Sequence, residues 1–110
     1  MTTAEDGCAL RIYIAENDKH GTRPLYEAIV QKAEELGLSG ATVQRASMGF
    51  GPKHHMVTAK VLRLGAELPI VVEIVDTRTH IDALLPHLEK MIADGLATLE
   101  PVEIRRFSST

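Results

Sequence analysis

The stretch Pro69-Ile-Val-Val-Glu-Ile-Val-Asp76 is the most apolar strand candidate in the chain, and the rest of the fold is built outward from it. Side chains alternate across a strand, so this stretch has two apolar rows. One row holds Ile70, Val72 and Ile74, and the other holds Val71 and Val75. Apolar residues on both sides are typical of a strand that is covered on both faces.

Two helices are expected, one on each side of this strand in the chain. The first begins at Thr22 or Arg23, with Pro24 in its first turn, and ends near Gly37. The second is capped by Thr77 or Thr79 and ends at Gly95. Pro86 lies inside the second helix and removes a backbone hydrogen bond, so a kink or an irregular turn is expected there.

Three further segments have strand patterns: Ala9 to Glu16, about Gly40 to Ser47, and Ala97 to Phe107. Met56 to Leu64 is a further candidate for extended chain, as part of a long hairpin arm. The order predicts an α+β, ferredoxin-like (βαββαβ) domain. Such a domain has a four-stranded antiparallel sheet, two helices on one face, and here a long loop between strands 2 and 3. We expect this domain over residues 9–107, with flexible tails at 1–8 and 108–110.

The second face of this sheet has no element of the chain to cover it. Tyr13, Ala15, Val71 and Val75 are expected to line it. Because a small sheet that is apolar on both faces usually buries the second face against a partner, the sequence predicts a homo-oligomer.

Composition excludes several classes of protein. The 110 residues are enough for one domain, and 45% hydrophobic with 25% charged residues is ordinary globular composition. A net charge of -3 argues against nucleic-acid binding. The single cysteine, Cys8, cannot form an internal disulfide. No signal peptide or membrane span is recognisable, so we expect a soluble cytoplasmic protein.

The charge is unevenly distributed. Leu36 to Ala66 contains no Asp or Glu, and its cations are Arg45, Lys53, Lys60 and Arg63, with His54 and His55 among them. This segregation favours an anionic ligand or partner near the segment. The alternative is a solvated basic loop that faces acidic neighbours.

Gly49-Phe50-Gly51, followed by Lys53, is either a plain turn or a ligand-binding loop. Glycines let backbone N–H groups approach an anion, but neither a Walker nor a Rossmann glycine pattern is present. His54 and His55 invite a metal site, yet zinc needs three or four ligands, which only a subunit interface would complete. Contact between these imidazoles and a phosphate or carboxylate is the other possibility.

Nothing resembles a nucleophile with its base, so no catalytic residue is assigned. Glu16 and Asp18 are candidates for an acid–base pair, although their ordinary role is turn chemistry. Arg105 and Arg106 point to opposite faces of the last strand. One of them would reach a phosphate at a subunit cleft, or both serve edge solubility.

The sequence resembles the PII-like signalling superfamily, which includes the nitrogen regulatory proteins, and most closely the bacterial family called domain of unknown function 190. Seven stretches carry this likeness: Leu10-Arg-Ile-Tyr-Ile with Glu16 and Asp18, Pro24-Leu-Tyr-Glu-Ala-Ile-Val, Gly40-Ala-Thr-Val, Met48-Gly-Phe-Gly, Thr58-Ala-Lys, Leu62-Arg-Leu, and Leu68 to Asp76. The likeness covers about residues 9–107.

This resemblance implies a ferredoxin-like homotrimer that binds an adenine or cyclic nucleotide, or a related small anionic metabolite, between subunits. It implies no required cofactor. The loop between strands 2 and 3, about Gly49 to Glu67, would contact a membrane transporter or an enzyme. By position, the ligand-binding residues would be Gly49, Phe50, Gly51, Lys53, His54, His55, Lys60, Arg63 and Arg105.

One departure concerns the phosphate loop that PII proteins carry after the second helix, Thr-Gly-(Lys/Arg)-x-Gly-Asp-Gly. This chain has Ile92-Ala-Asp-Gly-Leu-Ala-Thr there, with one glycine and no cation. A smaller or differently oriented anion than ATP therefore fits. The leading hypothesis is a PII-like regulator. The alternatives are a divalent-metal-binding trimer that uses His54 or His55, and a small enzyme that uses Glu16 and Asp18.

Overall fold

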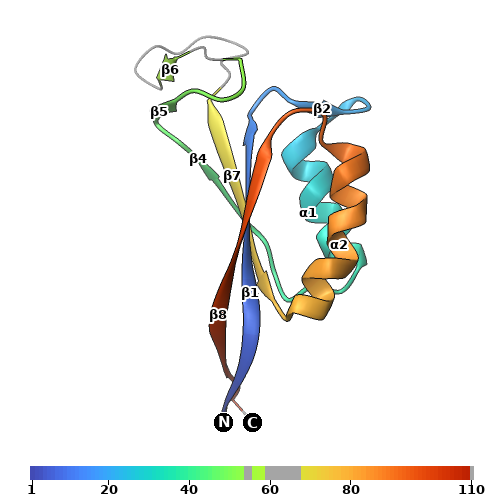
Figure 1. Ribbon diagram of the computed structural model, residues 1–110, viewed down its shortest axis with the longest axis vertical. Coiled ribbons are helices and arrows are strands. Elements are labelled where there is room, and N and C mark those ends of the chain that lie inside the picture. Colours follow the sequence, from blue (N-terminus) through green and yellow to red (C-terminus); the bar gives the residue numbers. More distant parts are fainter. Residues whose placement is uncertain (54–55, 59–67, 110) are drawn as a thin grey trace.

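The computed structural model describes residues 1–53, 56–58 and 68–109. The elements are β1 (Thr2–Ala15), β2 (Lys19–His20), β3 (Arg23–Pro24), α1 (Leu25–Glu35), β4 (Thr42–Arg45), β5 (Met48–Gly49), β6 (Val57–Thr58), β7 (Pro69–Asp76), α2 (Arg78–Met91) and β8 (Leu96–Phe107). β4, β7, β1 and β8 form, in that order, an antiparallel four-stranded sheet (Figure 1). The ferredoxin-like βαββαβ prediction is therefore confirmed, with β2–β3 and β5–β6 as small additional hairpins.

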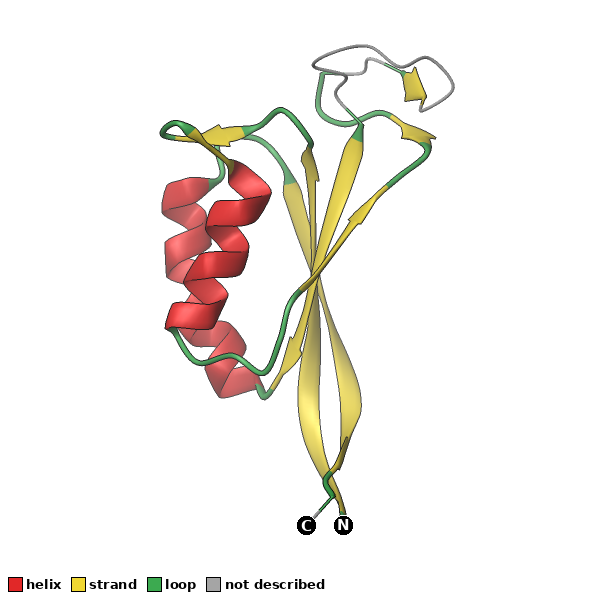
Figure 2. Ribbon diagram, turned by 180° about the vertical axis from the view of Figure 1, so that it is seen from behind, coloured by secondary structure: helices red, strands yellow, loops and turns green. Residues whose placement is uncertain are grey.

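Both helices cover the same face of the sheet, as Figure 2 shows. The core lies between these two layers. Its buried residues are Cys8, Leu10, Ile12, Ile14, Leu25, Ile29, Ala33, Ile70, Val72, Ile74, Ile81, Leu84 and Leu88. The even-numbered residues from Cys8 to Ile14 in β1 and from Ile70 to Ile74 in β7 share one face because Ile12 pairs opposite Val72, and this face is buried against the helices. Within the described residues, no helix is long and apolar enough to span a membrane.

The predicted tail at residues 1–8 is wrong. β1 starts at Thr2 and pairs with β8 from Thr2 opposite Phe107 to Tyr13 opposite Leu96. β7 pairs with β1 only from Cys8 onward, so residues 2–7 and their partners form a two-stranded arm beyond the helices. Figure 1 shows both ends of the chain at the tip of this arm. Cys8 is buried in the core rather than exposed in a tail.

Other boundaries differ in smaller ways. α1 starts one residue after Pro24, which caps it instead of lying in its first turn. α2 runs through Pro86 and ends at Met91, so the helix neither starts again after the proline nor reaches Gly95. Burial of Leu84 and Leu88 on either side of Pro86 keeps this helix on the sheet despite the missing N–H group. The strand expected over 40–47 is shorter, and of the stretch 56–64 the structure describes only 56–58.

No helix or strand among the described residues covers the face of the sheet opposite the helices. Tyr13 and Val75 are exposed on it, and Ala15 and Val71 are half-buried. At its centre, Arg11 donates hydrogen bonds to Glu73 at 2.8 Å and to Glu100 at 2.9 Å. We call this surface the open face; it has apolar positions at both ends and a charged group in the middle.

Candidate functional site

A pocket of about 690 Å³ lies at the end of the sheet away from the arm. It forms where the end of β1, the beginning of β8 and the segment 50–53 meet. Its lining residues are Tyr13, Ile14, Ala15, Asp18, Lys19, Leu25, Phe50, Gly51, Pro52, Lys53, Pro69, Ala93, Asp94, Gly95, Leu96 and Thr98. We call it the end pocket.

Apolar groups form much of the wall of the end pocket. Tyr13, Phe50 and Leu96 keep 40%, 56% and 60% of their surface exposed. Pocket walls that are largely apolar with a few polar groups are typical of small-ligand sites, and a volume of this size is within their range. Two aromatic rings also offer flat surfaces on which a planar ligand can stack.

The charged groups of the end pocket are two lysines and two aspartates. Lys19 and Lys53 form no ion pair with any described residue. The carboxylate of Asp18, in contrast, accepts a hydrogen bond of 3.0 Å from the backbone N–H of Ala15 and so closes the turn after β1. The lysines are therefore the available charges for an anion.

Two glycines make the walls of this pocket possible. A Cβ atom on Gly95 would lie 2.9 Å from the carbonyl oxygen of Tyr13, so the chain entering β8 passes too close to β1 for a side chain. Gly49 has φ 157° and a Cβ there would lie 3.0 Å from Pro69. Gly49 does not line the pocket itself, but it sets the course of the chain into Phe50.

The sequence-predicted site residues are therefore only partly brought together. Phe50, Gly51 and Lys53 line the end pocket, and Gly49 lies beside it. His54, His55, Lys60 and Arg63 lie outside the described residues. Tyr13, Lys19 and the wall segment 93–98 were not predicted as site residues, although the last occupies the place of the phosphate loop discussed above.

Arg105 lies far from this pocket. It pairs with Ala4 in the arm, nine residues along β8 from Leu96, which at about 3.3 Å per residue is roughly 30 Å away. Its guanidinium is 3.3 Å from the carboxylate of Glu103. Within one chain Arg105 therefore does not approach the segment 49–53, and a contact with ligand would require the arm of a neighbouring subunit.

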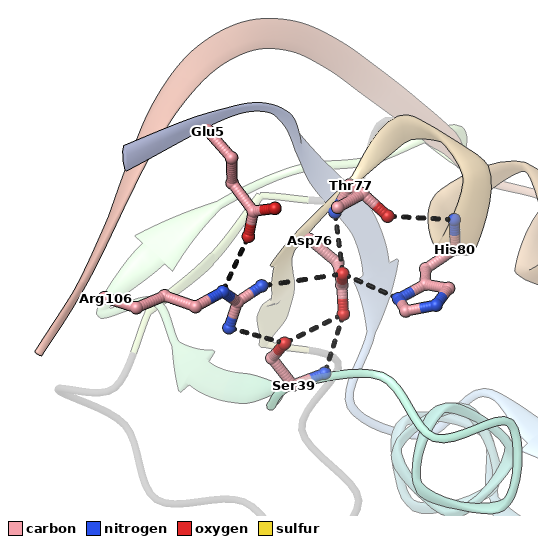
Figure 3. Close-up of polar contacts among 6 residues, drawn as sticks. All are labelled: Glu5, Ser39, Asp76, Thr77, His80 and Arg106. Carbon is pink, nitrogen blue, oxygen red and sulfur yellow. Dashed lines mark hydrogen bonds and ion pairs between the residues drawn. The ribbon is translucent and has the colours of Figure 1, made fainter. Parts of the chain in front are cut away.

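Arg106 belongs to a second polar cluster, which the sequence did not predict (Figure 3). The carboxylate of Asp76, at the end of β7, is fully buried. It accepts hydrogen bonds from Ser39 N–H at 2.7 Å, from Thr77 N–H at 2.6 Å and from the Ser39 hydroxyl at 3.0 Å. His80 Nδ1 is 2.8 Å from it, and Arg106 is at 3.8 Å.

This cluster holds the pKa of Asp76 low. Burial alone would raise the pKa, but the hydrogen bonds from Ser39, Thr77 and His80 outweigh burial and lower the pKa to about 2. Arg106 also donates to Ser39 Oγ at 2.9 Å and to Glu5 at 2.7 Å. Through the ionised carboxylate of Asp76, the cluster connects Arg106 in the arm with His80 in α2.

The same cluster does not have the arrangement of a serine nucleophile. The Ser39 hydroxyl donates to Asp76, and no hydrogen bond joins it to His80 in the described part of the chain. Glu16 is paired with Arg45, and Asp18 with the turn backbone, so the two carboxylates have separate structural partners. Among residues 1–53, 56–58 and 68–109, no three His, Cys, Asp or Glu side chains gather to hold a metal.

Comparison with known proteins places the chain in a family. The family model DUF190, described as "Uncharacterized ACR, COG1993", matches residues 7–104. The chain belongs to the DUF190 family. A UPF0166 protein of Aquifex aeolicus is 39% identical over 95 residues, which are 86% of this chain and 90% of that protein. A UPF0166 protein of Methanocaldococcus jannaschii is 34% identical over 86 residues, covering 78% and 79%.

Solved structures of PII-like proteins share the fold of this DUF190 protein. CPII of Thiomonas intermedia, bound to ADP and bicarbonate, superposes with a TM-score of 0.67 at 16% identity, covering 93% of this chain and 91% of that one. A putative PII-like signalling protein of Thermus thermophilus has a TM-score of 0.63 at 16% identity, covering 92% of this chain and 90% of that one. The GlnK–ATP complex of B. subtilis has a TM-score of 0.57 at 12% identity, covering 88% of this chain and 82% of that one. The fold is therefore PII-like.

Proposed function

We propose that this DUF190 protein is a PII-like regulatory protein that binds a small anionic ligand, of the class of adenine or cyclic nucleotides, in the end pocket. The observation that carries this is the position of Phe50 and Lys53. They lie at the start of the basic segment 49–67 and line the same pocket as Tyr13 and Leu96. A ligand there touches both the rigid sheet and the segment proposed to contact a target protein, such as a membrane transporter or an enzyme.

The pocket chemistry suits a planar base with an attached anion. The rings of Tyr13 and Phe50 supply stacking surfaces, and Lys19 and Lys53 supply positive charge. The wall segment 93–98 has no cation and contributes Asp94. A monophosphate, diphosphate or cyclic phosphate therefore fits this set better than a triphosphate.

We propose further that the protein is a homotrimer assembled through the open face. Tyr13, Leu96 and Thr98 belong to both the open face and the end pocket, since Tyr13 and Leu96 pair across β1 and β8. A subunit seated on this face would cover part of the pocket and place the ligand in a cleft between chains. The structures of CPII with ADP and bicarbonate and of GlnK with ATP show nucleotide binding in proteins of this fold and support the proposal.

Isothermal titration calorimetry with ADP, AMP, cyclic AMP and bicarbonate tests the ligand. We expect one nucleotide to bind, and Lys53→Ala to weaken it about tenfold because a charge-assisted contact is lost. Phe50→Ala should weaken it similarly through lost stacking. Arg78→Ala is the control, since Arg78 is an exposed residue paired with Asp82 in the first turn of α2.

Arg105→Ala separates the two ways of building the site. Weaker binding in this variant would mean that a neighbouring arm reaches the ligand, and unchanged binding would mean that Arg105 takes no part in the site. If no nucleotide or bicarbonate binds, the proposed ligand class is wrong. Divalent metals are titrated in the same way: if only they bind, and binding is lost in His54→Ala and His55→Ala, the metal-binding trimer replaces the proposed function.

A further inference from the structure

A second concave surface lies on the helix layer, on the side of the molecule away from the open face. It is a groove of about 380 Å³ between α1 and α2, which the hairpin β2–β3 also lines. Its lining residues are His20, Arg23, Ala28, Gln31, Lys32, Glu35, His87, Lys90 and Met91. It shares no residue with the end pocket. We call it the helix groove.

Helical spacing explains why these side chains meet. α1 contributes positions 28, 31, 32 and 35, and α2 contributes 87, 90 and 91, which are one face of each helix. Ala28 is buried at the bottom of the groove, where its small side chain leaves space between the two helices. On the hairpin, His20 is paired directly opposite Arg23, so both side chains lie on the same side of it.

The charge of the helix groove is mostly positive. Arg23, Lys32 and Lys90 face one carboxylate, Glu35, which is 2.9 Å from Lys32. Among the described residues, Arg23 and Lys90 form no ion pair. The pKa of the Glu35 carboxyl is lowered, first by the hydrogen bond from Lys32 and also by the nearby charges of Arg23 and His87. The groove therefore stabilises negative charge.

We propose that the helix groove binds a compact phosphate monoester, such as a sugar phosphate or a nucleoside monophosphate, through Arg23 and Lys90. A guanidinium matches two phosphate oxygens with its parallel N–H groups, and an ammonium adds a point charge. The imidazoles of His20 and His87 and the amide of Gln31 supply further donors. The volume is near the lower limit of small-ligand pockets, which selects a small ligand over an extended one.

This site does not depend on the proposed function of the end pocket. Both helices lie on the face of the sheet opposite the open face (Figure 2), and the groove lies between them, so assembly through the open face leaves the groove accessible. A ligand there would touch both helices and the hairpin that follows β1. It would therefore form a second input to the same chain.

NMR titration of the ¹⁵N-labelled protein with inorganic phosphate, AMP and glucose 6-phosphate tests the proposal. At about 10 mM ligand, we expect amide shifts at Gln31, Lys32 and Lys90, and none with adenosine or glucose, since weak sites of this kind bind in the millimolar range. Arg23→Ala combined with Lys90→Ala should weaken binding at least about tenfold. Lys53→Ala, in the end pocket, should leave the groove shifts unchanged.

Glu35→Gln distinguishes a loss of binding contacts from a failure to fold, because it is expected to strengthen binding. This variant removes the only carboxylate among the described residues that line the groove and releases Lys32, so binding should become tighter by about threefold or more. Unfolding cannot mimic such a gain. The proposal is overturned if no groove amide shifts with any of the three phosphates, if Arg23→Ala with Lys90→Ala binds as well as the wild type, or if Glu35→Gln binds more weakly.

Discussion

Ile104 occupies the space that a side chain on Gly7 would need. A Cβ atom at Gly7 would lie 2.2 Å from Cδ1 of Ile104 and 2.9 Å from the carbonyl oxygen of Asp76. The Ile104 side chain lies over Gly7, at the point where β7 ends and the arm begins. Glycine at this position therefore lets β8 close over β1.

We expect Gly7→Ala to lower the free energy of unfolding by about 1–3 kcal/mol, because the backbone contact with Asp76 cannot be relieved by rotating a side chain. Urea denaturation measures the loss. Gly40→Ala is the matched control, since a Cβ at Gly40 meets nothing within 4 Å. Ile104→Val removes Cδ1, so the double variant should lose less than the sum of the two single ones. Strict additivity would contradict this packing.

Asp76 should make the protein sensitive to acid. Its pKa is about 2 in the folded chain against an ordinary 3.8, so the ionised form stabilises the fold. This stabilisation is complete above about pH 4 and is lost as the pH falls from about 4 to 2. Asp76→Asn should be less stable by about 2 kcal/mol at neutral pH and show a flatter pH dependence below 4. Parallel acid curves for both proteins would disprove the assignment.

The open face should control assembly. Tyr13→Glu puts a charge on the apolar end of this face, and we expect it to shift sedimentation at micromolar concentration from a trimer to a monomer. Leu36→Glu is a matched control, because Leu36 is similarly exposed, 37% against 40%, but lies at the end of α1. Dissociation of the control, or a trimer that persists in Tyr13→Glu, would rule out this interface.

We expect Pro86 to lower the free energy of unfolding, because of its position inside α2. It lies inside α2 and has no N–H group to donate to the carbonyl of Asp82, four residues earlier. Pro86→Ala restores that hydrogen bond and should raise the free energy of unfolding by about 1 kcal/mol or more. Thermal denaturation measures the gain, with Glu89→Ala as an exposed control on the same helix. A lower melting temperature in Pro86→Ala would show that the proline is needed for packing.

Local patterns predicted the central elements well. β7 has the predicted bounds because Pro69 to Asp76 alternates between two apolar rows and has clear ends. The strand at residues 2–7 was not predicted, because these residues are mostly small or polar and show no alternating apolar pattern. The strand depends on pairing with residues about 100 positions away, and the hydrogen bond from Arg106 to Glu5 supports that pairing. Pro86 lies inside a continuous α2, so the irregular turn expected there is absent, because burial of its neighbours outweighs its poor helix propensity.

The candidate site was predictable to the extent that it is local. Phe50, Gly51 and Lys53 were found from a glycine pair in an acid-free segment. Tyr13 and Gly95 line the same pocket only because β1 and β8 are paired. The sequence around either residue does not indicate this pairing. Likewise Asp76 meets Ser39 and Arg106 from 37 and 30 positions away, beyond the reach of any spacing rule.

The two ends of the chain meet at the tip of the arm. The amino group of Met1 donates to the carbonyl oxygen of Ser108 at 2.7 Å, and Ser108 N–H donates back to Met1 at 2.9 Å. A fluorophore or carrier protein fused at either end would thus sit roughly 35 Å from the end pocket, because Thr2 and Phe107 are each eleven residues from Tyr13 and Leu96 at about 3.3 Å per strand residue. A short linker across this junction would make a circular permutant, which allows new ends to be opened elsewhere in the chain without breaking the sheet.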